Sequence, residues 1–537
     1  MALKDLACLI AVTHCVSGSL QFLSRPDLSP PRLNITVPAS PQTEAGYLFF
    51  TAARGDTPDS AGPDQPGAYI FRDNGELVWS GVGYWAGWVA DFSPIMLNGK
   101  PALRDFQGDV IPAIGRMLGN HALLDNSYRT ISVIHAATHR LSSAHEFEMV
   151  NESSVLIETP IMTVADLSSY GGKKRPEVLA RGRISRLASR FSSGHLGEKS
   201  VLFFKSCFFS PMLTKIDSAI PLDRKGTYDG RTYNSAWNYF HINSIDKDSE
   251  GDYLISARHY NAIFKINGSN GDIIWQLGGM KRSTFQIPSN LEFAFQHDAR
   301  FQYRSPDGEI EHISFFDNAA YSAPGREISP CSRGRYIELN NTAKSSKEIH
   351  TYHAPNNLIA HTQGSFRFLP NGNKLANWGS AGALTEFADD GTILFHAYLD
   401  SYPNKNVQSY RGFKANWTAV PSEEPADVVV WVSWNGDTET KTWKFYLIDK
   451  EPGEYHFLGS SRRSGFETRF ETIASAPDFR NHGELLVVAE ALDMNGNSLR
   501  KSRPVAFTAD TTYQDILEIQ RAQEHSKSGL SYNRLEL

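Results

Sequence analysis

The sequence predicts an all-β protein in which repeated β-hairpins form a β-propeller and a smaller β-sandwich closes the chain. The first observation is composition: 31 Phe, 21 Tyr and 10 Trp, together with 41 Gly among 537 residues, favour strands joined by turns. The second observation is a hairpin motif that recurs between residues 45 and 400. The third is a change in the sequence pattern after residue 400.

Length and charge limit the class of protein. A chain of 537 residues exceeds the size at which a single core stops growing, so we expect two domains. A hydrophobic content of 41% excludes a disordered or collagen-like chain. The 53 basic residues do not exceed the 59 acidic ones, which argues against a nucleic-acid partner. No apolar run approaches the ~20 residues of a spanning helix, so we expect no membrane span.

The first 18 residues resemble a secretory signal peptide. Lys4 precedes the apolar residues 6–12, and Val16, Ser17 and Gly18 offer a cleavage site after Gly18. The alternative is a buried N-terminal strand or helix. A signal peptide at residues 1–18 predicts that the protein enters the secretory pathway or is extracellular.

Cysteines and glycosylation sequons are compatible with secretion. Removal of residues 1–18 leaves Cys207 and Cys331, which form either one disulfide or two unrelated thiols. The sequons that predict a glycoprotein begin at Asn34, Asn151, Asn267, Asn340 and Asn416.

A recurring hairpin organises residues 45–400. A turn containing Gly is followed by two apolar residues and an aromatic residue at 73–79, 269–275 and 389–395, which end at Trp79, Trp275 and Phe395. Asn-Gly and Asp-Gly pairs supply the positive φ angles of tight β-hairpins. Such repeated strands predict propeller blades, with an array of β-sandwiches as the alternative. We expect the three aromatic residues at equivalent blade positions.

Residues 163–235 interrupt this pattern, and we interpret them as an insertion. Within it, residues 177–190 have helical periodicity and a basic face that is typical of a solvated surface.

The region after residue 400 predicts a second domain. Residues 427–434, 444–448 and 484–490 are strand-like, with turns at Asn435-Gly436 and Asn495-Gly496. We therefore expect a β-sandwich over residues 405–510. Residues 511–537 form a polar tail.

Several familiar chemistries are missing from the sequence. It contains no G-x-S-x-G elbow, no H-E-x-x-H pair and no phosphate-binding loop. Four cysteines, two of them inside the signal peptide, argue against a thiolate metal site. We expect no cofactor and no metal.

Three histidines and one arginine at or near strand starts form the candidate catalytic site: His145, His241, Arg258 and His297. Each histidine taken alone is more often a structural residue. Spread over several blades, however, the four side chains can converge at a central channel. Such a site offers hydrogen-bond donors and a cation to an anionic or polarised aromatic ligand.

Residues ~45–435 resemble the arylsulfotransferase family in its fungal, secreted form, on four motifs. They are FHINSIDKDSEGDYLISARHYNAIFKINGSNGDIIWQLGG (240–279), FQHDARF (295–301), SFFDNA (314–319) and LPNGNKLANWGSAGALTEF (369–387). The resemblance implies a six-bladed β-propeller with an added β-sandwich. Residues 192–221 depart from the family pattern, which leaves the shape of the site and its substrate open.

The resemblance implies sulfuryl transfer without a nucleotide cofactor. By motif, His145, His241, Arg258 and His297 resemble the site of the bacterial sulfotransferases, with His297 in the place of the transiently sulfated nucleophile. A neutral imidazole can attack sulfur and hold the sulfuryl group covalently. The other side chains would stabilise charge on the sulfate oxygens.

The resemblance also implies a second activity, because some fungal relatives are hetero-Diels–Alder cyclases. These join a tropolone-derived o-quinone methide to a humulene-type alkene, which requires orientation and polarising donors but no nucleophile. We place the cyclase first because assigned relatives include it, although the histidine set alone favours sulfuryl transfer. A non-catalytic binding propeller is the third alternative. The expected partners are small aromatic or terpenoid substrates.

Overall fold

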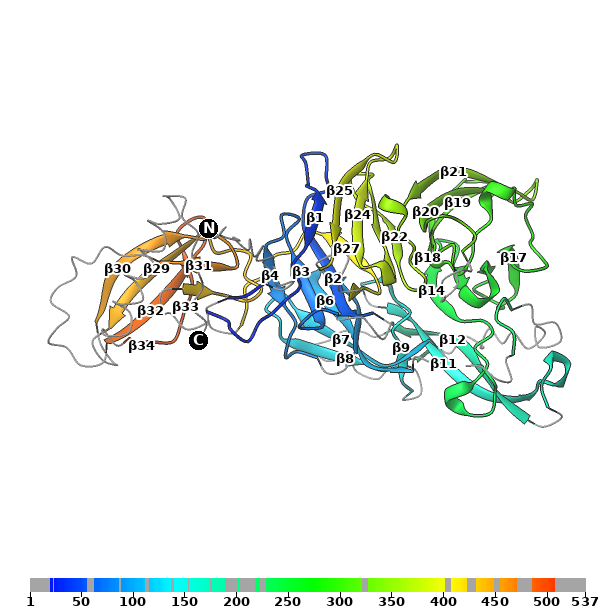
Figure 1. Cartoon of the computed structure of the whole chain (residues 1–537), viewed down its shortest axis with the longest axis horizontal. Helices are drawn as coiled ribbons and strands as arrows, with labels where there is room; N and C mark the ends of the chain where they lie inside the picture. Colours follow the sequence, from blue (N-terminus) through cyan, green and yellow to red (C-terminus); the bar gives the residue numbers. More distant parts are fainter. Residues whose placement is uncertain are drawn as a thin grey trace, which may run out of the picture.

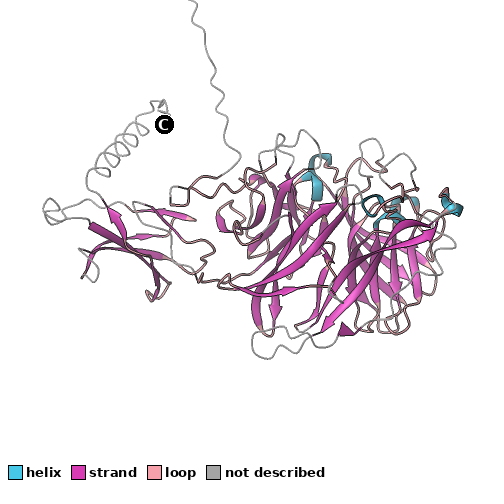
Figure 2. Cartoon of the chain, turned by 90° about the horizontal axis from the view of Figure 1, so that it is seen from below, coloured by secondary structure: helices cyan, strands magenta, loops and turns pink. Residues whose placement is uncertain are grey.

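The computed structural model describes residues 20–22, 24–55, 62–85, 88–111, 115–136, 140–152, 154–173, 176–188, 201–202, 218–222, 228–320, 327–400, 407–422, 431–448, 454–470 and 485–507. The expected signal peptide, the polar tail and Cys207 lie outside these residues. Strands dominate, joined by loops and single 3-10 turns (Figure 2). The all-β fold class is therefore confirmed. Among the residues described, no helix is long and apolar enough to cross a membrane.

Three antiparallel sheets come from the first part of the chain. Sheet 1 holds β2 (Tyr47–Arg54), β3 (Gly67–Phe71) and β4 (Leu77–Ser80), with β26 (Val407–Gln408) and β27 (Gly412–Ala415) beside β2. Sheet 2 holds β5 (Trp88–Leu97), β6 (Lys100–Ile111), β7 (Arg116–Asp125), β8 (Thr130–Ile134) and β9 (Ser142–Ser143). Sheet 3 holds β10 (Phe147–Asn151), β11 (Ser154–Asp166), β12 (Pro176–Ala188) and β13 (Val201–Leu202).

Three more sheets follow in chain order (Figure 1). Sheet 4 holds β14 (Ile242–Lys247), β15 (Tyr253–Ala257), β16 (Ala262–Ile266) and β17 (Ile273–Gly278). Sheet 5 holds β18 (His297–Arg304), β19 (Ile310–Asp317), β20 (Arg333–Asn340) and β21 (Ser345–His353). Sheet 6 holds β22 (Ser365–Phe368), β23 (Lys374–Asn377), β24 (Ala383–Phe387) and β25 (Ile393–Tyr398), with β1 (Asn34–Val37) beside β25.

The repeated aromatic residues occupy equivalent positions, as predicted. Each of Trp79, Trp275 and Phe395 is the third residue of β4, β17 or β25. Each also lies just after a register shift against the preceding strand of its sheet. The turn glycine before each strand has a positive φ, at Gly75, Gly271 and Gly391. The sequence repeat therefore corresponds to a structural repeat.

The core consists of apolar clusters shared between neighbouring sheets. Alternate residues of β15 face opposite sides, so that Leu254 packs toward sheet 5 while Ile255 packs toward sheet 3. Corresponding clusters join sheets 1 and 2, sheets 2 and 3, sheets 5 and 6, and sheets 6 and 1. Both faces are buried in strands such as β3, β15 and β24, which explains their largely apolar sequences.

The helix expected over residues 177–190 is wrong, because β12 occupies most of this segment. Its backbone pairs with β11 without interruption from Ser154↔Ala188 to Asp166↔Pro176. Gly182 and the β-branched Val178 and Ile184 disfavour a helix, and the ladder to β11 satisfies the backbone instead.

The C-terminal strands form two further sheets, set to one side of the others in Figure 1. One pairs β28 (Trp431–Ser433) with β31 (Glu467–Arg469). The other holds β29 (Thr442–Ile448), β30 (Tyr455–Arg462), β32 (Leu485–Leu492), β33 (Ser498–Lys501) and β34 (Val505–Phe507). Residues 407–415 fall inside the range expected for this domain, but they pair with β2.

The turn at Asn435 and Gly436 connects the C-terminal strands to sheet 1. The amide of Gly436 donates to the carbonyl of Val78 at 2.7 Å, and the hydroxyl of Tyr128 donates to the carbonyl of Gly436 at 2.7 Å. Asn435 bonds to both main-chain groups of Ser80. The predicted Asn-Gly turn is therefore present, and it docks on the edge strand β4.

Candidate active site

The four predicted residues lie at the starts of elements in three neighbouring sheets. His145 and His241 come just before the inner strands β10 and β14, Arg258 opens the 3-10 turn η6 (Arg258–Tyr260), and His297 opens β18. The exposed fractions are 3% for His145, 4% for His241, 4% for Arg258 and 3% for His297. Burial of four polar side chains requires that each has partners.

His145 and His241 are in direct contact. Their Nε2 atoms are 3.1 Å apart, and the rings meet edge to face with centroids 4.7 Å apart. These residues are 96 positions apart in the sequence. The predicted pairing of different strand starts is thus present for these two.

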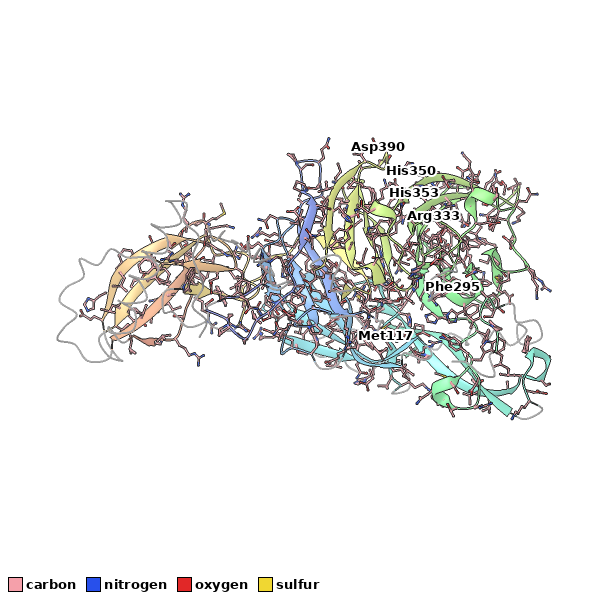
Figure 3. The ribbon with its side chains drawn as sticks, in the orientation of Figure 1. Met117, Phe295, Arg333, His350, His353 and Asp390 are labelled. Atoms are coloured by element: carbon pink, nitrogen blue, oxygen red, sulfur yellow. The ribbon has the colours of Figure 1, made fainter. Side chains whose placement is uncertain are left out.

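Arg258 joins this pair through a residue that the prediction did not select. Its Nη1 donates to Nε2 of His259 at 2.8 Å, and the His259 ring lies 4.5 Å from that of His241. The guanidinium also bonds to the carbonyl of His361 and lies over the ring of Phe295, which Figure 3 labels. His259 directly follows Arg258 in the sequence. This adjacency to a predicted site residue was the sequence signal that could have identified His259.

His297 lies beside this group and is anchored separately. Its Nδ1 is 2.6 Å from Oδ1 of Asn318, whose amide nitrogen donates to the carbonyls of Ala360 and Gln363. Asn318 therefore presents only an acceptor to the imidazole, so Nδ1 carries the proton and Nε2 keeps its lone pair. An electrostatic interaction with Arg258 connects His297 to the other three residues.

The imidazoles of this cluster are uncharged near neutral pH. Burial, reinforced by Arg258, lowers the pKa of His297 to about 3. Burial followed by the charge of Arg116 holds the pKa of His145 well below its usual range. Burial, followed by the neighbouring His259, does the same for His241. Neutral rings can act as nucleophiles or acceptors, and Arg258 supplies the positive charge.

The backbone is strained around these residues. His241, Phe295 and Asp298 each have a φ of 55°, in the left-handed region that residues with a Cβ rarely adopt. Asp298 sits within a register shift between His297 and Arg300. Such strain is typical of functional sites, where the surrounding structure compensates for its cost.

A buried ionic network holds the strand starts together, and sequence reasoning missed it. Arg411 donates to the carboxylate of Glu146 at 2.9 Å and to the carbonyl of Asn243 at 2.9 Å. Arg300 bonds to Glu146 and also to Asp298. These groups come from sheets 1, 3, 4 and 5. Two of the acidic residues directly follow site histidines, in His145-Glu146 and His297-Asp298. These adjacent pairs were the sequence signal that could have identified the network.

No group of three or more histidine, cysteine or acidic side chains is arranged to hold a metal ion within the described ranges. Cys331 is a buried thiol whose Sγ lies 3.6 Å from Nδ1 of His353. Its pairing with Cys207 stays open, because Cys207 lies outside the described residues.

Solved structures resemble the chain only weakly. A protein of unknown function from Bacteroides caccae has a TM-score of 0.32 and 10% identity, covering 69% of this chain and 98% of its own. A Lactobacillus plantarum protein has a TM-score of 0.30 and 11% identity, with coverage of 79% and 99%. A catalytically inactive virginiamycin B lyase from Staphylococcus aureus, solved with quinupristin, has a TM-score of 0.28 and 9% identity, with coverage of 75% and 97%. Similarity at this level carries no argument about function.

No curated protein sequence matches the chain significantly. The family model described as Arylsulfotransferase (ASST) matches residues 93–399. This match spans more than half of the chain and contains all four candidate site residues. The chain therefore belongs to the arylsulfotransferase (ASST) family.

Proposed function

We propose that the protein is an aryl sulfotransferase that needs no nucleotide cofactor and carries the sulfuryl group on His297. The observation that carries this proposal is the anchoring of His297 by Asn318 at 2.6 Å. It directs the proton to Nδ1 and leaves a neutral lone pair on Nε2, which is the state required of a nucleophile.

The proposed first step is attack of His297 Nε2 on the sulfur of an aryl sulfate. The N–S bond forms as the S–O bond to the aryl group breaks, and the phenolate leaves with the electron pair of that bond. The ring then carries a positive charge, which the Nδ1–H bond to Asn318 stabilises. In the second step an acceptor phenolate attacks the same sulfur, and the imidazole leaves as a neutral ring.

Arg258 and the neighbouring imidazoles have the chemistry to stabilise the transferring group. A planar guanidinium matches the oxygens of a sulfate, and a buried site strengthens its electrostatic effect. Removal of one such donor typically lowers the rate by about 10²- to 10³-fold.

The proposed architecture for this site is a six-bladed propeller with a small C-terminal β-sandwich. It is supported by the apolar clusters shared by successive sheets, including the cluster that joins sheet 6 to sheet 1. The pairing of β26 and β27 with β2 is the second support, because it ties the last strands of this region to the first sheet.

The cyclase and the non-catalytic binding propeller stay predictions, as do the secretory localisation, the glycosylation and the domain boundaries. Sulfuryl transfer is placed ahead of the cyclase here because a cycloaddition gives no role to an imidazole lone pair held on Nε2.

The test is an incubation of the purified protein with p-nitrophenyl sulfate and a phenol acceptor. We expect release of p-nitrophenol, formation of the acceptor sulfate and a sulfated peptide containing His297 in the mass spectrum. His297→Gln should lose both the turnover and the sulfated peptide. A sulfate carried by another residue, or no transfer to any phenol tested, would overturn the proposal.

A further inference from the structure

A relay of hydrogen bonds connects the buried Arg116 to both contacting histidines. Arg116, the first residue of β7, donates from Nη2 to Oδ1 of Asn238 at 3.0 Å. Nδ2 of Asn238 lies 2.8 Å from Nδ1 of His241. Nε2 of His241 meets Nε2 of His145, and Nδ1 of His145 lies 2.6 Å from Oγ of Ser143. We call these five residues the Arg116 relay.

The direction of the relay is fixed at its arginine end. A guanidinium can only donate hydrogen bonds, so the atom of Asn238 that faces Arg116 is the amide oxygen. The amide nitrogen then faces His241, and it too can only donate. Nδ1 of His241 must therefore accept, which means that it carries no proton.

The remaining protons follow from this assignment. A neutral His241 without a proton on Nδ1 carries its proton on Nε2, which donates to Nε2 of His145. His145 then carries its own proton on Nδ1, and that proton bonds to Ser143. The main-chain amide of His145 also donates to Oγ of Ser143, in agreement with an accepting hydroxyl.

Asn238 fixes a further imidazole through its main chain. Its carbonyl accepts from Nδ1 of His259, while Nε2 of His259 accepts from Arg258. One asparagine therefore fixes the proton on His241 with its side chain and the proton on His259 with its backbone.

We propose that Arg116 is a positioning residue that, by orienting Asn238, holds His241 as a permanent Nε2–H donor and His145 as an acceptor through Nε2. In the sulfuryl transfer proposed above, on which its functional role rests, this leaves His297 as the imidazole of the group whose Nε2 lone pair accepts no hydrogen bond from a residue that the structure describes. In that reaction the Nε2–H of His241, which donates to His145 in this structure, would be the proton offered to a sulfate oxygen when substrate binds. The guanidinium of Arg116 also donates to the carboxylate of Glu158 at 2.8 Å. Its charge is therefore balanced within the protein and does not serve to bind substrate.

The relay is tested in the wild-type protein by nitrogen-15 NMR of histidine-labelled protein at neutral pH. Each His resonance is assigned from single His→Gln variants. We expect His241 as the Nε2–H tautomer, and His145 and His259 as Nδ1–H tautomers. A proton on Nδ1 of His241, or a charged His241, would overturn the proposal. This readout needs no turnover, so it stands apart from any failure of the sulfotransferase assay.

Asn238→Asp keeps a hydrogen-bond acceptor for Arg116 but replaces the donor that faces His241 with an acceptor. The new carboxylate accepts from Arg116 and also faces Nδ1 of His241 with an acceptor, which draws a proton onto that atom. We expect the His241 tautomer to change in the NMR spectrum and kcat for aryl sulfate to fall by about 10²- to 10³-fold. An unchanged tautomer with unchanged kcat contradicts the proposal.

Asn377→Asp is the matched control for burial of a new carboxyl group. Asn377 on β23 is fully buried and donates to the carbonyl of Ser409, but it belongs to sheet 6 and has no place in the relay. We expect this variant to lose stability and to keep the wild-type tautomer of His241. A tautomer change in Asn377→Asp would mean that the NMR readout reports general unfolding, and it would remove the support that Asn238→Asp gives.

Discussion

The guanidinium of Arg411 donates to the main-chain carbonyl of His145 at 2.8 Å, although 266 positions separate the two residues. The hydroxyl of Tyr410 donates to the same carbonyl at 3.3 Å. His145 is therefore held from its backbone by a segment of sheet 1 and from its imidazole by the Arg116 relay. A residue fixed at both ends can keep a catalytic geometry without help from substrate.

Loss of the Arg411 charge should destabilise the whole region. In Arg411→Met, the carboxylates of Glu146 and Asp91 remain buried with fewer cationic partners. Breaking a buried ion pair in this way costs about 3–5 kcal/mol. The free energy of unfolding from denaturant titration measures the loss.

The control for this measurement is Arg129→Met, which breaks the exposed pair between Arg129 and Asp125. Arg129 is 70% exposed, and exposed pairs contribute about 0–1 kcal/mol. Equal losses in Arg411→Met and Arg129→Met would show that the buried network is not what stabilises these sheets.

Replacement of Arg258 by lysine should reduce sulfuryl transfer more than stability. A lysine keeps the charge but cannot reproduce the planar fork that meets both His259 and the carbonyl of His361. We expect kcat to fall by about 10²- to 10³-fold. Assays with p-nitrophenyl sulfate measure the rate.

Arg333→Lys is the matched substitution outside the site. Arg333 also bridges two acceptors, Asp317 and the carbonyl of Glu292, and Figure 3 shows its place on sheet 5. Its loss should affect the free energy of unfolding and leave kcat near the wild-type value. A comparable fall in kcat for both variants would argue against a specific role of Arg258.

Stability should depend on pH through His297. Its pKa is about 3 in the folded protein and 6.5 in the unfolded chain, so between these values the unfolded chain binds the extra proton. The free energy of unfolding therefore falls as the pH drops below 6.5, by at most about 1.4 kcal/mol per pH unit for one group. This contribution is fully present above pH 6.5. Denaturant titrations across this window should show a shallower slope in His297→Gln, and an unchanged slope would contradict the assignment.

The Asn435-Gly436 turn should tolerate no side chain at Gly436. Its φ is +86°, and an added Cβ would lie 2.2 Å from the ring of Tyr128 and 2.6 Å from that of Trp79. We expect Gly436→Ala to lose about 1–3 kcal/mol from overpacking in addition to backbone strain. Limited proteolysis should then release the C-terminal strands more readily.

Gly496→Ala isolates the backbone part of this effect. Gly496 has a similar φ of +81°, but no atom lies within 4 Å of its added Cβ. A loss in Gly496→Ala as large as that in Gly436→Ala would show that the contact with Tyr128 and Trp79 is unimportant.

Local patterns in the sequence predicted the elements that local chemistry determines. Glycine turns followed by an apolar pair and an aromatic residue identified the equivalent strands that hold Trp79, Trp275 and Phe395. Periodicity failed for residues 177–190, because pairing with β11 decides the conformation there and the sequence of the segment itself does not show that partner.

The sequence predicted only those site residues whose chemistry can be recognised from the residue and its immediate neighbours. Motifs singled out His145, His241, Arg258 and His297, since each has chemistry of its own. Arg116 and Arg411 give no such signal, because their importance comes from partners 122 and 266 positions away. The acidic residues that follow His145 and His297 were the sequence features that indicated a need for buried cationic partners.

The first and last strands of the six-sheet region each pair with a strand from the opposite end of that region. β1 pairs with β25 and β27 pairs with β2, so residue 34 meets residue 398 and residue 47 meets residue 415. During synthesis, β2 cannot complete its pairing with β27 until the ribosome has made residue 415, and β1 cannot pair until β25 has been made. Loop closure of this length is slow. The nascent chain therefore depends on its last-made strands for the completion of its first-made sheet, and a message cut short before residue 407 would yield a product with an open, aggregation-prone edge at β2.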